Sequence, residues 1–517
     1  MMIKKTKIVA TLGPASSSKD VLREMMLAGV NVCRLNFSHG AYEDHAKVVQ
    51  VIRELNEETG LNVAILADLQ GPKIRTDLME NNGVDLITGS EVTIVTDKVI
   101  GTAEKFSINY DKLPRDVQPG ERILLDDGKL ALEIISTNGI DEIKALVVHG
   151  GILSSKKGVN FPNTKISMPS LTPKDLEDLD FALNQNVDWI GLSFVRSARD
   201  IIELKYIIAH RKCKAKVIAK IEKPEAIEEI DEIIRESDAL MVARGDLGVE
   251  IPYQSVPIIQ KMLINKCIIH AKPVIVATQM MESMITNISP TRAEVNDVAN
   301  AVLDGADAVM LSGETSVGNH PIEVIKTMAN IVTEMEKFGG IYNKEEIPEK
   351  NQNRFITDSI CFNGCRLSQR VEADAIITMT FSGYTAYKIA SQRPKAPIFI
   401  FTSNKQILTQ INLIWGVRGF YYDKQVSTDH TIADIKYLLK KEGLVETGDL
   451  VINIPKISFT LRGLSIIGGG GEDDAARPRI QRVGLAPHQV PGHTLVHQVA
   501  HGLFAHAGIG RQVGQAR

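Results

Sequence analysis

The chain has 517 residues, too many for one hydrophobic core, so about two to four domains are expected. Its apolar share of 44% and charged share of 24% are ordinary for a globular protein, and a net charge of −4 argues against nucleic-acid or membrane partners. Five scattered cysteines argue against a disulfide framework, and no apolar run reaches the roughly 18–20 residues of a transmembrane helix. We therefore expect a cytoplasmic protein.

Short apolar runs alternate along the chain with amphipathic stretches of helix length. The runs are 7–12, 30–36, 63–69, 188–195, 216–222, 239–243, 273–278 and 308–312, and the helix candidates include 18–28, 42–59, 172–184 and 227–237. A capping box at Thr291 and Glu294 begins a further helix that is expected to end at Gly305. Buried strands that alternate with helices are the signature of a (β/α)8 TIM barrel, an α/β fold.

The alternation is interrupted after the third strand and ends before the C-terminus. Residues 73–167 show period-two patterns, at 91–96, 122–125, 131–135 and 144–148, which predict an inserted small β-barrel domain. The barrel then comprises 1–72 and 168–345, and a C-terminal α/β domain follows at 346–466, with strands at 375–379 and 398–402 and helices at 385–392 and 405–415. We expect 467–517, which contain no lysine, to form an atypical, disordered tail.

Reactive side chains stand at the C-terminal ends of six of the eight predicted barrel strands. Glu222 and Asp246 are hard oxygen ligands that suit Mg²⁺ or Mn²⁺. Arg34, Arg75 and Lys220 are fixed cations that suit a phosphate. A single charged strand end is usually a solvated rim, but six at one barrel mouth indicate an active site. A metal with cations around a transferring group is what phosphoryl transfer requires.

Seven motifs give the chain a family resemblance. They are Arg-Leu-Asn-Phe-Ser-His-Gly at 34–40, Gly-Pro-Lys-Ile-Arg at 71–75, Ala-Lys-Ile-Glu at 219–222, Met-Val-Ala-Arg-Gly-Asp-Leu-Gly at 241–248, Ala-Thr-Gln-Met at 277–280, Pro-Thr-Arg-Ala-Glu at 290–294 and Leu-Ser-Gly-Glu-Thr at 311–315. In order and spacing, from about residue 3 to 455, the chain resembles the pyruvate kinases. The resemblance implies a glycolytic, homotetrameric enzyme that transfers phosphate from phosphoenolpyruvate to ADP, giving pyruvate and ATP.

The resemblance also implies a role for each matched residue. The catalytic residues would be Lys220, Arg34, Arg75 and Thr278; the substrate-binding residues Lys220, Ala243, Arg244, Gly245, Asp246, Thr278 and Ser312; the metal ligands Glu222 and Asp246; and the nucleotide-binding residues Arg34, Asn36, His39 and Lys157. Backbone amides of 243–246 would face the substrate carboxylate at a helix N-terminus. The inserted domain would act as a lid that excludes water.

The sequence departs from the family at the monovalent-cation site. Many members bind K⁺ through the positions of Asn36, Ser38, Asp68 and the residue after it, which is commonly threonine, while a glutamate follows the Gly-Pro pair. Here these last two positions are Leu69 and Lys73. The ammonium of Lys73 would supply the charge that K⁺ supplies elsewhere, unless it points into solvent. We expect activity that does not require K⁺.

A second departure concerns the C-terminal domain. Thr378, Thr380, Ser382, Gly383 and Thr385 lie between a strand and a helix, where small hydroxyl residues make a phosphate cradle. The loop resembles the family's effector site for a sugar phosphate or AMP, and ordinary helix capping is the alternative. The family's usual final strand with a Thr-Asn-Thr-like element is absent, which puts an intact effector pocket in doubt.

Two other functions compete with the kinase. A Mg²⁺-dependent barrel aldolase or lyase acting on an oxo-acid enolate would use Glu222 and Asp246 equally well. The two phosphate-gripping arginines and the inserted domain favour the kinase instead. A non-catalytic effector-binding protein is the other rival, but no residue of the catalytic set has been lost.

Overall fold

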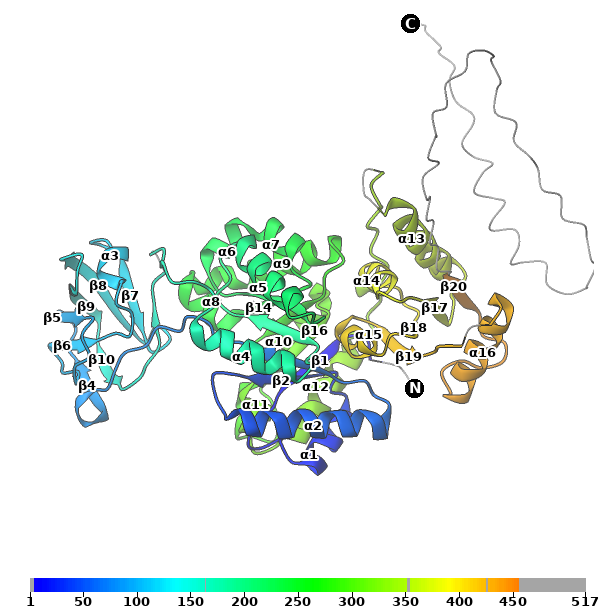
Figure 1. The fold of residues 1–517 in the computed structure, drawn as a ribbon, viewed down its shortest axis with the longest axis horizontal. Coiled ribbons are helices and arrows are strands. Elements are labelled where there is room, and N and C mark those ends of the chain that lie inside the picture. Colours follow the sequence, from blue (N-terminus) through cyan, green and yellow to red (C-terminus); the bar gives the residue numbers. More distant parts are fainter. Residues whose placement is uncertain (1–3, 163, 351–353, 425, 455–517) are drawn as a thin grey trace, which may run out of the picture. The chain divides into compact units, whose positions relative to one another are not determined.

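The computed structural model describes residues 4–454 except 163, 351–353 and 425, so the predicted tail lies outside the described residues. Eight parallel strands close into a barrel in the order β1-β16-β15-β14-β13-β12-β3-β2 (Figure 1). Their bounds are β1 Lys7–Thr11, β2 Val32–Asn36, β3 Ala64–Asp68, β12 Trp189–Leu192, β13 Lys216–Ile221, β14 Ala239–Ala243, β15 Val274–Ala277 and β16 Ala308–Leu311. The predicted TIM barrel is confirmed.

The barrel strands are buried on both faces, which explains their continuous apolar sequences. Every residue of β1, β3 and β14 is buried. Trp189, Met241 and Ile275 belong to one core cluster, while residues on the alternate positions, such as Ile190 and Val242, belong to a second cluster that includes the helices. Parallel register, with Asn36 opposite Asp68, brings the C-terminal strand ends together at one mouth.

Helices surround the barrel strands and begin and end close to the predicted positions. They are α1 Lys19–Ala28, α2 Tyr42–Thr59, α4 Pro173–Asn184, α5 Ala198–His210, α6 Pro224–Glu228, α7 Ile230–Glu236, α8 Arg244–Glu250, α9 Val256–Ile269, α10 Arg292–Asp304, α11 Gly313–Ser316 and α12 Pro321–Met335. The capping box of Thr291 and Glu294 is present, and Gly305 ends α10 with φ 99°. The single helix expected at 227–237 is wrong in detail: α6 and α7 are separated at Glu229 (φ −99°, ψ 19°).

The insertion between β3 and β12 is an all-β region with two sheets. A six-stranded sheet runs β11-β7-β8-β9-β5-β6, and β10 pairs with β4. The elements are β4 Gly83–Leu86, β5 Glu91–Val95, β6 Lys105–Ser107, α3 Leu113–Asp116, β7 Arg122–Leu125, β8 Leu130–Thr137, β9 Glu142–His149, β10 Gly151–Ser154 and β11 Val159–Asn160. The region has a core of its own around Phe106 and Leu132.

The C-terminal region is a parallel sheet in the order β19-β18-β17-β20 with helices, as expected for an α/β domain. Its elements are α13 Phe355–Arg370, β17 Ala375–Met379, α14 Tyr384–Ser391, β18 Ile398–Thr402, α15 Lys405–Gln410, β19 Val417–Tyr421, α16 Thr428–Lys441 and β20 Val451–Ile454. The helix expected at 405–415 ends early at Gln410, and a single 3₁₀ turn, Ile411–Leu413, follows it.

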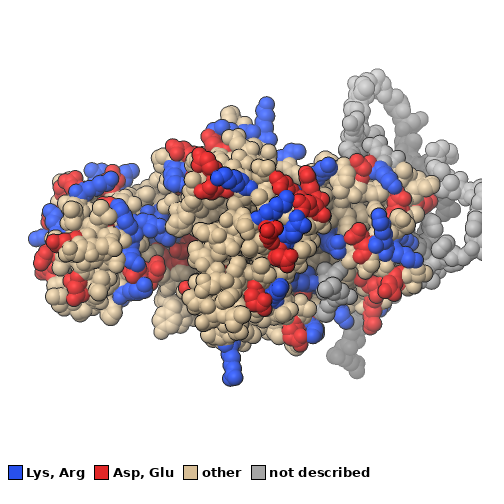
Figure 2. All heavy atoms as spheres, turned by 90° about the horizontal axis from the view of Figure 1, so that it is seen from below, with Lys and Arg blue, Asp and Glu red and all other residues tan. Residues whose placement is uncertain are grey.

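The described helices include none with both the length and the apolar run that crossing a bilayer demands. On the face drawn in Figure 2, basic and acidic side chains are interspersed, with apolar and neutral residues between them. This mixture matches the small net charge of −4 and provides no broad field of one sign on that face.

Candidate active site

Lys220 is the centre of a buried charge cluster at the C-terminal ends of β3 and β13. Its ammonium donates to Ser193 Oγ at 2.6 Å, and it lies 2.9 Å from Glu222 Oε1 and 3.2 Å from Asp68 Oδ1. The Lys220 side chain is 11% exposed, and both carboxylate side chains are 1% exposed. This cluster presents one ammonium toward the barrel mouth with two carboxylates behind it.

Arg34 extends the cluster from β2. Its Nε donates to Asp68 Oδ2 at 2.6 Å, and Nη1 donates to Thr11 Oγ1 at 2.9 Å. One buried aspartate therefore holds two cations side by side, since its other oxygen faces Lys220. Two cations fixed in this way are preorganised for an anion, because they need not rearrange when it binds.

The pKa values of this cluster follow from burial and neighbouring charge. Burial lowers the pKa of Lys220, but the opposing pull of Asp68 and Glu222 is greater, so the pKa ends above its usual range. Burial raises the pKa of Asp68, and Lys220 and Arg34 outweigh that effect, so this pKa is lowered. Lys220 is therefore a permanent cation and Asp68 a permanent anion at neutral pH.

Glu222 and Asp246 form a pair of carboxylates beside Lys220. Glu222 Oε2 accepts the backbone N–H of Phe194 at 2.8 Å. Burial raises the pKa of Glu222, with Lys220 opposing the shift and Asp246 adding to it. A carboxylate whose ionisation is made more costly by burial and by a neighbouring carboxylate is relieved by a bound cation. Asp246 lies in the first turn of α8, and this helix begins directly after Ala243, the last residue of β14.

The end of β15 is a strained turn packed against α8. Thr278 and Gln279 both have positive φ, at 70° and 55°. Such a φ is especially unusual for Thr278, because its side chain is β-branched. Thr278 Oγ1 accepts the N–H of Gly245 at 2.8 Å, and a Cβ on Gly245 would stand 3.3 Å from that oxygen. Glycine therefore allows the close approach that holds Thr278 at the helix N-terminus.

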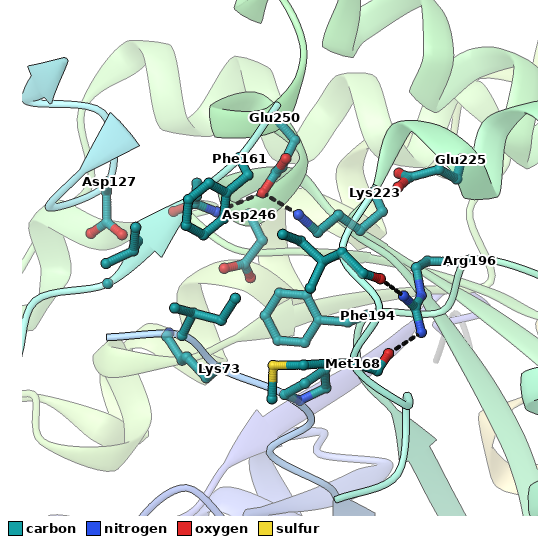
Figure 3. Close-up of a pocket in the computed structure, with 16 residues that line it drawn as sticks. Lys73, Asp127, Phe161, Met168, Phe194, Arg196, Lys223, Glu225, Asp246 and Glu250 are labelled. Atoms are coloured by element: carbon teal, nitrogen blue, oxygen red, sulfur yellow. Dashed lines mark hydrogen bonds and ion pairs between the residues drawn. The ribbon is translucent and has the colours of Figure 1, made fainter. Parts of the chain in front are cut away.

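A pocket of about 40 Å³ lies between the barrel mouth and the inserted domain (Figure 3). The barrel supplies Asp246, Glu250, Lys223, Glu225, Phe194 and Arg196, and the insertion with its connections supplies Pro72, Lys73, Ile74, Asp127, Gly158, Val159, Asn160, Phe161, Ile166 and Met168. Phe194 is another residue with positive φ, 54°. Its backbone thus turns at the place where its N–H contacts Glu222.

Comparison with known proteins gives the family. The family model "Pyruvate kinase, barrel domain" matches residues 3–325, and "Pyruvate kinase, alpha/beta domain" matches 358–464. The chain belongs to the pyruvate kinase family. It is 46% identical over 462 residues to the pyruvate kinase of Geobacillus stearothermophilus, which covers 87% of this chain and 77% of that protein.

Two other relatives agree with this assignment. The pyruvate kinase of Corynebacterium efficiens is 44% identical over 451 residues, covering 87% of this chain and 94% of that protein. A crystal structure of a pyruvate kinase from Cryptosporidium parvum has a TM-score of 0.83 and 36% identity, covering 87% and 93% of the two chains. The chain is accordingly a phosphotransferase of the pyruvate kinase family.

Not all residues of the predicted set come together in this structure. Arg75 donates from Nη1 to the carbonyl of Lys156 at 3.2 Å, within the insertion, and has no recorded bond to the Lys220 cluster among the described residues. Lys157 is paired with Asp126 at 2.8 Å. His39 is exposed, and its carbonyl contacts the ring of His45 at 3.0 Å. None of these three side chains has a hydrogen bond or ion pair to Lys220, Glu222 or Asp68 among the described residues.

Other predicted residues act through the backbone or support a turn. The Arg244 guanidinium turns to Asp297, at 2.6 and 2.7 Å, so only its backbone N–H remains for a substrate. Asn36 Oδ1 accepts the N–H of Ser38 at 3.1 Å. Ser312 donates its N–H to Glu314 Oε2 at 2.6 Å.

The predicted cation region shows where Lys73 lies. Lys73 lines the pocket of Figure 3 together with Asp127 and Asp246, and no ion pair to it is found within the described residues. Leu69 is buried and offers only its carbonyl, which accepts Ser193 Oγ at 2.7 Å. Lys73 is thus a pocket-lining residue, and no hydrogen bond or ion pair joins its side chain to Asn36, Ser38 or Asp68 in the part of the chain described.

The predicted effector loop leads into α14. Thr378 Oγ1 donates to the carbonyl of Ile454 at 2.9 Å, and Thr380 Oγ1 accepts the N–H of Gly383 at 3.0 Å. Gly383, with φ 82°, is the N-cap. Ser382 is exposed, and Thr385 Oγ1 is buried without a hydrogen-bond partner among the described residues. Two of the hydroxyls therefore stabilise the loop, while Ser382 and Thr385 remain for a ligand.

Sequence analysis missed several residues that hold the site. Ser193 joins Lys220 to Leu69, and Thr11 supports Arg34. Arg196 donates to the carbonyls of Ile166 and Met168, in the segment that returns from the insertion to the barrel (Figure 3). Ser193 directly follows the last residue of β12 and was detectable on that ground, whereas the partners of Arg196 depend on contacts that only the fold reveals.

Proposed function

We propose that the chain transfers the phosphoryl group of phosphoenolpyruvate to ADP with Mg²⁺ or Mn²⁺, and that it does not require K⁺. The observation that carries the proposal is the Lys220 cluster, with Arg34 and Lys220 held by one buried aspartate at 2.6 and 3.2 Å. The P–O bond to the enol oxygen breaks while a bond to the terminal ADP oxygen forms, and the enolate that remains takes a proton at carbon.

Each residue's chemistry follows from its surroundings. Lys220 is cationic and preorganised, so it offsets charge on the transferring group and then on the enolate oxygen. Arg34 presents its guanidinium to the same phosphate. The Ala243–Asp246 backbone at the start of α8 faces the substrate carboxylate. Thr278 Oγ1 stands at this N-terminus and relays the proton, through water, to the enolate carbon.

Glu222 and Asp246 suit the divalent ion. Among the described residues, no group of three or more His, Cys, Asp or Glu side chains is arranged to hold a metal. A pair of carboxylates is what Mg²⁺ uses when waters and substrate oxygens complete its octahedron. The raised pKa of Glu222, to which burial and the charge of Asp246 contribute, supports a cation there. The bound ion would neutralise charge on the substrate oxygens.

The test is pyruvate formation from phosphoenolpyruvate, ADP and Mg²⁺, coupled to lactate dehydrogenase, in tetramethylammonium buffer without K⁺. Turnover that needs both substrates supports the kinase and the K⁺-independence together. Turnover only after K⁺ is added keeps the kinase and removes the K⁺ claim. Pyruvate released from an oxo-acid substrate without phosphoenolpyruvate would favour the aldolase or lyase, which shares Glu222 and Asp246.

The C-terminal loop supports an allosteric role. We propose that Ser382, Thr385 and the N-terminus of α14 bind the phosphate of a sugar phosphate or AMP, because the hydroxyl of Thr385 is buried and unpartnered among the described residues. Calorimetry with fructose 1,6-bisphosphate, AMP and ribose 5-phosphate tests this. Heat that disappears in Thr385→Val supports it, and absence of binding by all three reduces the loop to a helix cap. A homotetramer is proposed as well, to be measured by light scattering.

A further inference from the structure

Glu250 is a buried junction between the barrel and the inserted domain. Its Oε1 accepts Lys223 Nζ at 2.7 Å and Asn160 Nδ2 at 2.8 Å, as the dashed lines in Figure 3 show. The Glu250 side chain is 1% exposed and that of Lys223 12% exposed. Glu250 Oε2 is buried without a hydrogen-bond partner within the described residues. One oxygen of this carboxylate therefore pairs with the ammonium of Lys223 in the barrel and accepts a hydrogen bond from the neutral amide of Asn160 in the insertion.

The Lys223–Glu250 ion pair lies close in sequence to both proposed metal carboxylates. Glu250 ends α8, one helical turn after Asp246, so the two side chains lie on the same face of that helix. Lys223 directly follows Glu222 at the end of β13. The Lys223–Glu250 ion pair thus ties the backbone that carries one proposed metal carboxylate to the helix that carries the other.

The second arm reaches the insertion. Asn160 is the last residue of β11, which pairs with β7 through Asn160 and Leu124. Within the described residues, the side-chain amide of Asn160 donates the hydrogen bond that joins this strand to Glu250 on α8. A displacement of the insertion away from the barrel must break that bond, leaving Glu250 with Lys223 alone.

We propose that Glu250 is a positioning residue that aligns Glu222 with Asp246 through Lys223 and couples this alignment to the closed position of the insertion through Asn160. The inference rests on the proposed function, because it takes Glu222 and Asp246 as the metal carboxylates. Glu250 itself lies one turn from Asp246 and acts through its neighbours. Removing the Lys223–Glu250 ion pair and removing the Asn160–Glu250 hydrogen bond should therefore cause different defects.

The experiment measures Mn²⁺ binding by the electron paramagnetic resonance of free Mn²⁺, alongside steady-state kinetics on the full chain. Glu250→Gln and Lys223→Met should weaken Mn²⁺ binding about tenfold, since removing a partner of a ligand costs about 10–100-fold. Lys223→Arg should restore binding to within about threefold, because it keeps the ion pair. Asn160→Ala should leave Mn²⁺ binding unchanged and lower kcat about tenfold, because only the insertion is released.

A double-mutant cycle separates coupling from general damage. Asn160→Ala combined with Glu250→Leu should lower kcat no more than Glu250→Leu alone, because leucine cannot accept the hydrogen bond that the two residues share. Glu225→Gln is the matched control: it removes the same charge at the same pocket, and no side-chain bond of Glu225 is recorded in the described residues. It should bind Mn²⁺ as the parent does.

The outcomes distinguish this inference from the proposed function. If Glu222→Gln retains the Mn²⁺ affinity of the parent, the proposed metal site is wrong and the inference falls with it. If Glu222→Gln loses Mn²⁺ but Glu250→Gln and Lys223→Met bind it normally, the inference alone is overturned. Additive kcat losses in the double mutant would overturn the coupling through Asn160.

Discussion

Thr278 has a strained backbone conformation at the position proposed to relay the proton. A β-branched residue at φ 70° is disfavoured, yet two bonds hold it: Oγ1 donates to the carbonyl of Ala277 at 2.6 Å and accepts from Gly245 at 2.8 Å. The hydroxyl is therefore fixed beside the N-terminus of α8. Fixing a hydroxyl there suits proton delivery to an enolate held by the same helix.

Thr278→Ala is expected to lower kcat about a hundredfold, because removal of a positioned proton donor costs about 10²–10⁴-fold. Thr278→Ser keeps the oxygen and should stay within about threefold of the parent. Exchange of the pyruvate methyl protons with deuterated water, followed by NMR, isolates the proton step from phosphoryl transfer. Equal exchange rates in the alanine and serine variants would remove the relay role.

Lys73 is the residue on which the proposed K⁺-independence depends. Lys73 is one of the residues that line the pocket of Figure 3, as are Asp127 and Asp246. Lys73→Glu reverses this charge, so added K⁺ should activate the variant by at least about tenfold, while the parent changes by less than about twofold. Initial rates in tetramethylammonium buffer with increasing KCl give both numbers. An unresponsive variant, or a parent that needs K⁺, would contradict the role of Lys73.

At the scale of elements, Arg244 joins three segments of the barrel mouth. From the start of α8 its guanidinium contacts Asp297 on α10 at 2.6 and 2.7 Å, and the carbonyl of Thr278 at 2.7 Å. This planar fork braces the strained turn after β15. The resemblance gave Arg244 a substrate role through its backbone amide, and the structure shows its side chain holding the turn after β15.

Arg244→Lys should therefore destabilise the barrel by about 2 kcal/mol, because one ammonium replaces a bidentate fork at a side chain that is 12% exposed. Arg235→Lys is the control: Arg235 pairs with Glu232 in an exposed i,i+3 contact, and the change should cost less than about 0.5 kcal/mol. Chemical unfolding followed by circular dichroism measures both. Equal losses would show that the bracing contributes nothing.

Sequence patterns were most informative for the barrel strands. Runs such as 239–243 matched the observed strand end for end, because strands buried on both faces have no polar positions inside them. The helix at 227–237 failed because its apolar spacing continues across the break at Glu229. Hydrogen bonds of the site were harder to foresee: Lys220 and Ser193 are 27 positions apart, and Asn160 and Glu250 are 90 apart. Such partners are set by strand order and loop path.

At the scale of the whole molecule, the first strand joins the barrel to the C-terminal α/β region. Lys7 Nζ donates to the carbonyl of Val417 on β19 at 2.7 Å, and the residue is only 4% exposed. Arg393 reaches back to Asp307 at 2.8 Å, and the N–H of Trp415 donates to the same carboxylate at 3.2 Å. The sequence places Lys7 at the start of a predicted strand, but no local pattern marks its side chain as buried.

Burial, reinforced by Lys4 and opposed by Glu336 and Asp307, lowers the pKa of Lys7 to about 7. An unfolded lysine titrates near 10.4, so between about pH 7 and pH 10 the unfolded chain binds more protons than the folded one. Stability contributed by this group must therefore rise with pH over that window. From pH 7 to pH 9 the gain should be about 2 kcal/mol.

Lys7→Met should remove this gain, so the difference in unfolding free energy between parent and variant should grow in the parent's favour from pH 7 to pH 9. Tryptophan fluorescence during urea unfolding is a suitable readout, because the Trp415 ring lies 5.4 Å from Lys5 Nζ at this junction. Lys47→Met, at a side chain that is 76% exposed, should leave the pH dependence unchanged. If Lys7→Met and the parent gain stability in parallel, Lys7 is charged in the folded protein throughout, and the junction does not respond to pH.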